Sequence, residues 1–235
     1  MESQVLHLSF FSPNLRQEKR YCIYLPPSYH YEKNRRYSSL YLLPGLMDYE
    51  RTWCDKGLVN HHMDSLIQDG KIGEMIVVMP DKDQAALEFH MAKHFTGYLA
   101  YDLIGHIDHE FRTIPNRKHR GIEGLSLGAS WALRLGLTFP ELYSSVSSLS
   151  GGYSEEMYSN ILEKKDYIKA LGMRFRIAAG TDEPEFIQES RHFAEFLKGL
   201  GFYCEFSLDE GPHEWTLWSK QVYNSLQFHY YSFNG

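Results

Sequence analysis

The sequence lacks the features that mark disulfide-stapled, membrane-spanning and nucleic-acid-binding proteins. It has three cysteines in 235 residues, Cys22, Cys54 and Cys204, and their odd number and scattered spacing exclude a disulfide framework. No apolar run approaches the roughly 18 residues that a membrane span needs. The net charge is −6 and no block of five like charges occurs, which argues against nucleic-acid binding. We therefore expect reduced, structural thiols, no membrane span and no nucleic-acid partner.

The start of the chain and its length bound the organisation further. Met1-Glu2-Ser3-Gln4 does not form a basic segment followed by an apolar one, so no signal peptide is predicted and a cytoplasmic location is expected. A length of 235 residues suits one large α/β domain or two small ones. Because the chain shows neither a linker nor an internal repeat, we predict a single domain over residues 1–235.

Aromatic residues are abundant, at 15% of the chain with 17 tyrosines. Such a content can line an aromatic-walled pocket or give a tyrosine-rich surface, and we favour the surface. The twelve histidines are also numerous. His90 and His94 are four residues apart and could share a metal on one helix face, but no third ligand of matching spacing follows. His61 and His62 are similarly isolated, so we expect solvated surfaces there and predict no metal site.

Apolar runs and amphipathic segments alternate after a β-rich beginning. The continuous run Met75–Met79 is typical of a strand buried on both faces. Apolar residues at four-residue steps predict a helix over 95–111. The alternation predicts an α/β fold with a mainly parallel sheet covered by helices on both faces. The predicted strands are Val5–Phe11, Arg20–Leu25, Ser38–Leu43, Met75–Met79, a strand entering residue 124, Ser144–Leu149, Phe175–Ala179 and Tyr203–Leu208; further helices are predicted over Leu58–Gln68, after residue 126, and over Glu155–Lys165, Glu185–Leu200 and Trp215–Tyr231.

The most informative stretch is Gly124-Leu125-Ser126-Leu127-Gly128, a G-x-S-x-G pattern. A serine between a buried strand and a helix stands on a tight turn that presents its hydroxyl at the carboxyl end of the sheet. The flanking glycines allow neighbouring backbone to approach where a side chain would clash. The pentapeptide alone is a weak signal, but its setting between strand and helix makes Ser126 a candidate nucleophile.

A serine nucleophile needs a base and a carboxylate that orients the base. In this architecture the chain order is serine, acid, histidine. Asp182 and Glu183 follow a predicted strand, and His213 follows the last one in a Gly-Pro loop. The sequence therefore offers Ser126, His213 and one of the two acids as a catalytic set.

Several segments, taken together in order, resemble the esterase D-type branch of the α/β-hydrolases, which includes S-formylglutathione hydrolases, feruloyl, acetyl-xylan and tributyrin-type esterases, and mycolyltransferases. The resemblance covers most of the chain. The segments are Tyr24-Leu25-Pro26-Pro27-Ser28-Tyr29, Leu42-Leu43-Pro44-Gly45, Val77-Val78-Met79-Pro80-Asp81, Phe111-Arg112-Thr113, the G-x-S-x-G with Phe139-Pro140, Leu149-Ser150-Gly151, and His213-Glu214-Trp215 with Trp218.

The resemblance implies an α/β-hydrolase fold with Ser126 as nucleophile and His213 as general base. The family's acid commonly stands third after a glycine, which points to Glu183, although the usual residue is Asp and Asp182 stays open. An oxyanion needs two preorganised donors. The backbone N–H of Leu127 is one, and the family-like choice for the other is Leu46, where Pro44-Gly45 replaces the usual His-Gly.

These observations predict a serine carboxylesterase of short-chain or small acyl esters that works through an acyl-enzyme, with no metal or cofactor. Asp48, Tyr49 and Trp53 follow a buried strand and are expected to border the substrate mouth. An acyltransferase, a thioesterase of the S-formylglutathione hydrolase kind and a non-catalytic binding protein on the same fold are the alternatives. The Cys-containing loop of the S-formylglutathione group is absent after the third strand, and self-association is left open.

Overall fold

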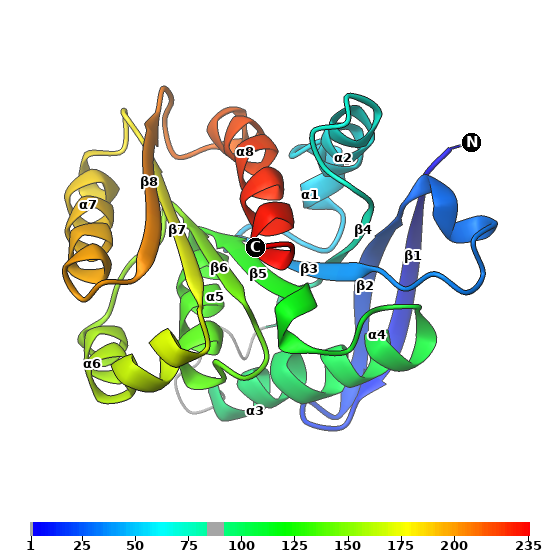
Figure 1. The fold of residues 1–235 in the computed structure, drawn as a ribbon, viewed down its shortest axis with the longest axis horizontal. Coiled ribbons are helices and arrows are strands. Elements are labelled where there is room, and N and C mark those ends of the chain that lie inside the picture. The colour runs from blue at the N-terminus through cyan, green and yellow to red at the C-terminus, as the bar shows by residue number, and fades with distance from the viewer. Residues whose placement is uncertain (1, 84–91) are drawn as a thin grey trace.

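The computed structural model describes residues 2–83 and 92–235, which build a central sheet with helices on both faces (Figure 1). Within these residues the sheet has eight strands in the order β1-β2-β4-β3-β5-β6-β7-β8. The β1–β2 and β2–β4 pairs are antiparallel and the other neighbouring pairs are parallel. The predicted mainly parallel α/β sheet is therefore confirmed. The strands are β1 (Gln4–Ser12), β2 (Gln17–Leu25), β3 (Ser38–Leu43), β4 (Met75–Pro80), β5 (Arg120–Leu125), β6 (Ser145–Leu149), β7 (Arg174–Gly180) and β8 (Tyr203–Asp209).

The helices follow the predicted segments closely, with one irregularity. The helix predicted over 95–111 is present, but a π-helical stretch, η4 (Tyr98–Leu103), joins its two α-helical parts. The α-helices are α1 (Thr52–Asp55), α2 (Val59–Gln68), α3 (Ala92–Gly97), α4 (Ile104–Glu110), α5 (Leu127–Thr138), α6 (Glu155–Ala170), α7 (Pro184–Gly199) and α8 (Trp215–Phe233); η1 (Pro27–His30) and η5 (Arg117–His119) are short 3₁₀ helices.

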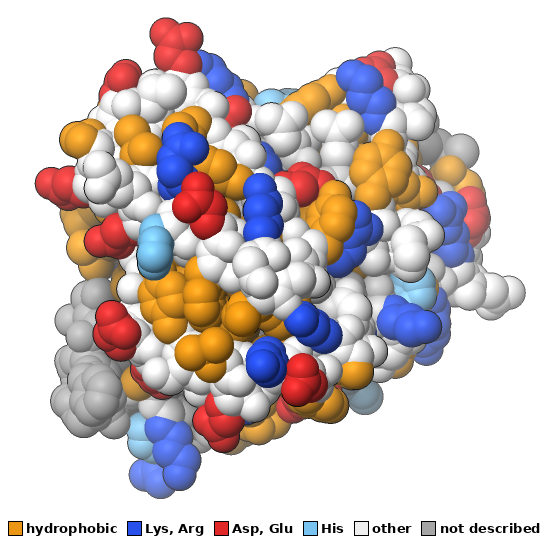
Figure 2. Space-filling model, turned by 60° about the vertical axis from the view of Figure 1, so that its left-hand side comes forward, with side chains coloured by type: hydrophobic (Ala, Val, Ile, Leu, Met, Phe, Trp, Pro, Cys, Tyr) orange, Lys and Arg blue, Asp and Glu red, His pale blue; other side chains and the backbone are white. Residues whose placement is uncertain are grey.

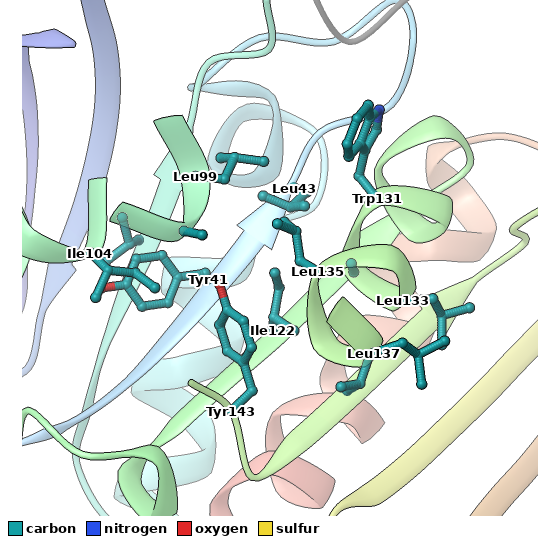
Figure 3. Packing of buried hydrophobic residues seen from close by; sticks show 14 of the residues in the cluster. Tyr41, Leu43, Leu99, Ile104, Ile122, Trp131, Leu133, Leu135, Leu137 and Tyr143 are labelled. Atoms are coloured by element: carbon teal, nitrogen blue, oxygen red, sulfur yellow. The ribbon is translucent and has the colours of Figure 1, made fainter. Parts of the chain in front are cut away.

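Two apolar layers hold the helices to the sheet. On one face, α3 to α7 pack on the strands through a cluster in which Leu135 of α5 lies against Ile122 of β5 and Leu43 of β3 (Figure 3). On the other face, α1, α2 and α8 cover a second cluster that includes Trp53 and Met63. Both layers consist of closely packed, buried side chains, and they support the parallel strands up to the ends where the loops leave the sheet.

The tyrosines correct one of the expectations. We expected them mainly on the surface, but several fill the core because their rings supply a large apolar area. Tyr24, for example, is fully buried and its hydroxyl donates to Asp64 Oδ1 at 2.7 Å. The fully buried tyrosines are Tyr21, Tyr24, Tyr37, Tyr41, Tyr98 and Tyr143.

One histidine lies in the core, where it forms a buried polar pair with a glutamate. His229 of α8 and Glu123 of β5 are both fully buried, with 3.3 Å between Nε2 and Oε2. The other ring nitrogen, Nδ1, lies 2.7 Å from Ser145 Oγ. Gly121 leaves the space for the ring, since a Cβ there would stand 2.6 Å from His229 Nδ1. The pair ties the last helix to the strand that precedes Ser126.

The face that carries α6 and α7 has a groove between these helices. Its volume is about 660 Å³. Figure 2 brings this side of the molecule forward and shows hydrophobic side chains gathered near the middle of it. The groove shares no lining residue with the cleft at Ser126 described below. Its lining is Tyr153, Glu155, Tyr158, Leu162, Gln188, Glu189, His192 and Phe196.

Two absences can be stated for the residues described. Over residues 2–83 and 92–235, no helix combines the length and apolar character needed to cross a membrane. The three cysteines are free thiols in this structure. Cys22 is buried, while Cys54 and Cys204 are partly buried.

Candidate active site

Ser126 stands on a strained turn between β5 and α5. Its backbone has φ 52° and ψ −118°, a left-handed conformation that a non-glycine residue adopts only under tertiary constraint. The two flanking glycines make this turn possible. A Cβ on Gly124 would lie 2.2 Å from the backbone of Gly128, and one on Gly128 would lie 2.4 Å from Leu43 O. The pattern G-x-S-x-G therefore reflects two close backbone approaches around one exposed hydroxyl.

His213 and Glu183 form a hydrogen-bonded line with Ser126. His213 Nε2 lies 3.0 Å from Ser126 Oγ, and His213 Nδ1 lies 2.5 Å from Glu183 Oε1. The three residues come from the loops after β5, β7 and β8, which end at the same edge of the sheet. Because Glu183 accepts at Nδ1, the Nε2 atom is free to accept the hydroxyl proton of Ser126.

The carboxylate of Glu183 is buried and has three donors. Its side chain is fully buried, while that of His213 is 34% exposed. Oε2 accepts from Ser150 Oγ at 2.7 Å and from the backbone N–H of Gly180. Burial alone raises the pKa of Glu183, but the hydrogen bonds from His213, Ser150 and Gly180 outweigh it and lower the pKa below its ordinary value. The group is therefore held as a carboxylate.

Asp182, the other candidate acid, lies outside this hydrogen-bonded line. Its side chain is exposed and its nearest polar partner is the hydroxyl of Thr181, 3.3 Å from Oδ1. Its backbone N–H donates to Gly211 O at 3.1 Å. Asp182 lies in the turn that follows β7, whereas Glu183 is the residue that directly precedes the first turn of α7. The structure brings Glu183, and not Asp182, to the histidine.

Two aromatic rings hold the imidazole of His213. Phe186 stacks on it with 4.6 Å between ring centroids and 12° between planes. Trp218 meets it edge-on, at 4.8 Å and 85°. The spacing of apolar residues along α7 predicts Phe186 on the core side together with Phe193. Phe193 is buried in the core, but Phe186 sits in the first turn of α7 and covers the histidine instead.

Leu46 and Leu127, the two residues expected to donate backbone N–H groups to an oxyanion, come from the loop after β3 and from the start of α5. Leu127 is the first residue of α5, where a helix has no partner of its own for the N–H group. Leu46 lies in the loop after β3 and lines the same cleft as Ser126. In residues 2–83 and 92–235, neither N–H donates to another protein group, so both can receive a ligand oxygen.

An open cleft of about 370 Å³ leads to Ser126. One side is apolar, with Leu46, Met47 and Trp215, and Lys56 supplies a cation. Leu46 and Met47 are 45% and 85% exposed, so they form an uncovered lip. The full lining is Gly45, Leu46, Met47, Asp48, Lys56, Leu125, Ser126, His213, Glu214, Trp215 and Trp218.

The three residues expected at the substrate mouth lie differently from one another. Asp48 lines the cleft but is only 6% exposed, and its Oδ1 accepts a hydrogen bond from Trp215 Nε1 at 3.0 Å, so it supports the tryptophan. Tyr49 is 41% exposed outside the lining. The expectation for Trp53 is wrong, because its side chain is fully buried. It packs against Trp215 with 5.3 Å between ring centroids. Counting from a strand end locates a loop but not the direction of each side chain.

Sequence reasoning missed several residues of this site. Ser150, Phe186 and the aromatic wall residue Trp215 had no assigned role in the site, although Ser150 follows the end of a strand that neighbours β5. A polar residue directly after a parallel strand is the signal that could have found it. As for a metal, residues 2–83 and 92–235 contain no cluster of three His, Cys, Asp or Glu side chains that could hold an ion. His94 is exposed, and His90 lies outside the described residues.

Comparison with known proteins agrees with this architecture. An endo-1,4-beta-xylanase/feruloyl esterase from Xylanibacter ruminicola is 32% identical over 226 residues, which are 92% of this chain and 30% of that protein. The chain thus spans about a third of the length of this relative. A solved ferulic acid esterase superposes with a TM-score of 0.87 at 24% identity and covers 99% of both chains. An S-formylglutathione hydrolase from Staphylococcus aureus superposes at 0.79 with 16% identity, covering 97% of this chain and 99% of that one.

The two solved structures are less than 25% identical and show the shared α/β-hydrolase fold. The family assignment comes from a family model. The model named Esterase, with the description "Putative esterase", matches residues 12–229, which include Ser126, Glu183 and His213. The chain therefore belongs to the Esterase family of ester-cleaving α/β-hydrolases.

Proposed function

We propose that this protein is a serine carboxylesterase of short-chain or small acyl esters, with Ser126 as nucleophile, His213 as general base and Glu183 as the orienting acid. One observation carries the proposal. The line from Glu183 through His213 to Ser126 has contacts of 2.5 and 3.0 Å and ends in an open cleft. The single domain over residues 1–235 carries all three groups.

The geometry supports a two-step reaction. His213 Nε2 takes the proton of Ser126 as Oγ attacks the ester carbonyl, and the N–H groups of Leu127 and Leu46 stabilise the oxyanion. The ester C–O bond then breaks, the alcohol leaves with the proton from His213, and the acyl group stays on Ser126. Water attacks this acyl-enzyme with His213 again as base, which releases the acid and restores the serine.

The cleft supports small ester substrates with an apolar portion. It is about 370 Å³ in volume and is open, and its lip carries Leu46 and Met47 beside Trp215. Asp48 contributes by fixing the indole of Trp215 rather than by direct contact. Feruloyl esters enter as candidates because the relative with 32% identity is named an endo-1,4-beta-xylanase/feruloyl esterase.

Two other activities use the same three side chains. An acyltransferase differs only in the acceptor of the second step, and a thioesterase differs only in the leaving atom. The solved S-formylglutathione hydrolase shares the fold and motivates the thioesterase comparison. Acceptance of an alcohol in place of water, or faster cleavage of thioesters than of matched oxygen esters, would favour one of these two.

The proposal is tested with purified wild type and Ser126→Ala on p-nitrophenyl esters of increasing acyl length, feruloyl esters, acetylated sugars and S-formylglutathione. The variant should keep its fold by circular dichroism and lose about 10⁴- to 10⁶-fold in kcat. A fluorophosphonate probe should label Ser126 in the wild type and leave the variant unlabelled. Turnover of the variant near the wild-type rate, with contamination excluded, would refute the assignment and return the chain to a binding role.

A further inference from the structure

The end of β6 connects the strand that carries the nucleophile to the strand that precedes the acid. β6 lies between β5 and β7 in the sheet. The backbone N–H of Ser126 donates to Leu149 O at 2.8 Å, and the next residue, Ser150, donates from its own N–H to Ala178 O at 2.8 Å. The peptide group after β6 is thus fixed to both neighbours, and Ser150 stands between Ser126 and Glu183.

The side chain of Ser150 points toward the acid. It is fully buried, and its hydroxyl donates to Glu183 Oε2 at 2.7 Å. The hydroxyl oxygen of Ser150 also accepts a hydrogen bond from Trp218 Nε1 at 3.2 Å. An indole N–H can only donate, so it occupies a lone pair of the serine oxygen. The serine proton is therefore directed to the carboxylate of Glu183.

The backbone of Ser150, like that of Ser126, has a positive φ. Its φ is 53°, in the left-handed region where glycine is the residue without a steric cost. A serine here accepts strain that a glycine would avoid. Glycine lacks the hydroxyl that contacts the buried acid. The strained serine therefore makes a hydrogen bond to Glu183 that glycine could not make.

We propose that Ser150 is a positioning residue that holds the carboxylate of Glu183 in the orientation that His213 needs. This inference rests on the proposed esterase function. A glutamate has one more rotatable bond than the aspartate usual in the family, so its carboxylate requires more external support. Ser150 and the Gly180 N–H fix Oε2, which leaves Oε1 aimed at His213 Nδ1.

The test compares Ser150→Ala, Ser150→Gly and the control Ser148→Ala on p-nitrophenyl acetate. Ser148 is a fully buried serine of β6 whose Oγ lies 3.2 Å from Tyr153 OH, away from the acid. Both Ser150 variants should lose about 10- to 100-fold in kcat with KM within about twofold, as expected for a lost hydrogen bond to a charged group. The control should stay within about twofold of wild type in both constants.

The alanine and glycine variants separate the hydroxyl from the backbone. Glycine should unfold at a higher temperature than alanine, because it relieves the strain at φ 53°, yet it should be equally slow. Recovery of wild-type kcat by Ser150→Gly would overturn the proposal and leave only a backbone role. Unchanged kcat in both variants would also overturn it. Loss of activity in Ser126→Ala in the same assay would, in either case, still support the proposed esterase function.

Discussion

The two nitrogen atoms of His213 face very different surroundings. On the Nδ1 side, Glu183 and Ser150 are buried, and neither lines the cleft. On the Nε2 side, Ser126 opens into a cleft whose lip residues Leu46 and Met47 are 45% and 85% exposed. The difference indicates a division of labour, since a rigid buried side can set the geometry of the reaction while an open side can select the substrate. Changes on the buried side should lower kcat, and changes on the open side should act on KM.

The largest expected effect in this comparison concerns the acid. Glu183→Gln should lose about 10²- to 10⁴-fold in kcat, because an amide neither stabilises the imidazolium nor fixes its tautomer. Asp182→Asn is the matched control and should lose less than about tenfold, since its side chain is exposed. Steady-state kinetics of both variants on one ester decides the point. The reverse order would make Asp182 the orienting acid, and two small losses would place the acid elsewhere.

The nucleophile turn could be predicted from sequence because its constraints are local. Gly124 and Gly128 lie within five residues, and their lack of side chains allows the backbone to close the turn. The strand before the turn and the helix after it are both visible as apolar patterns in the sequence. Most strands and helices were predicted for the same reason. The family resemblance also pointed to Glu183, which local pattern alone could not choose from two adjacent acids.

What could not be predicted depends on contacts between distant segments. Ser150 meets Glu183 across 33 positions, and its environment exists only once β6 lies between β5 and β7. Phe186 has the spacing of a core residue on α7, but its ring stacks on His213, a contact that exists only once the loops after β7 and β8 lie side by side. Trp53 shows the converse, an aromatic in a promising loop whose side chain is fully buried.

A smaller effect is expected from Phe186, which covers one face of the imidazole at the boundary of the two sides. Phe186→Leu keeps apolar bulk but removes the ring stacked 4.6 Å from His213. Aromatic pairs contribute about 0.5 to 1.5 kcal/mol beyond their buried area, which corresponds to about a 2- to 10-fold loss in kcat if the histidine becomes less well placed. Phe196→Leu, farther along the same helix, is the control and should leave kcat unchanged. A change in KM alone would assign Phe186 to the open side.

The smallest effect on catalysis is expected at the lip itself. Met47 is 85% exposed and lines the cleft, so shortening its side chain should change the stability of the free enzyme very little. A bound ester with a long or aromatic portion would cover the side chain and gain roughly 0.8 kcal/mol for each buried methylene. Met47→Ala should therefore raise KM for butyryl or feruloyl esters by about 3- to 10-fold with kcat unchanged, and should leave acetyl esters unaffected because they are too short to reach the lip.

Met47→Leu is the matched control for this last change, since it keeps the apolar volume and should keep the wild-type KM for every ester. The ratio of kcat/KM between a long and an acetyl ester, measured for the three proteins, is the quantity to compare. An equal loss on long and acetyl esters would mean that Met47 supports the loop that carries the Leu46 N–H. The open side would then share in fixing the reaction geometry, and the division between the two sides of His213 would not hold.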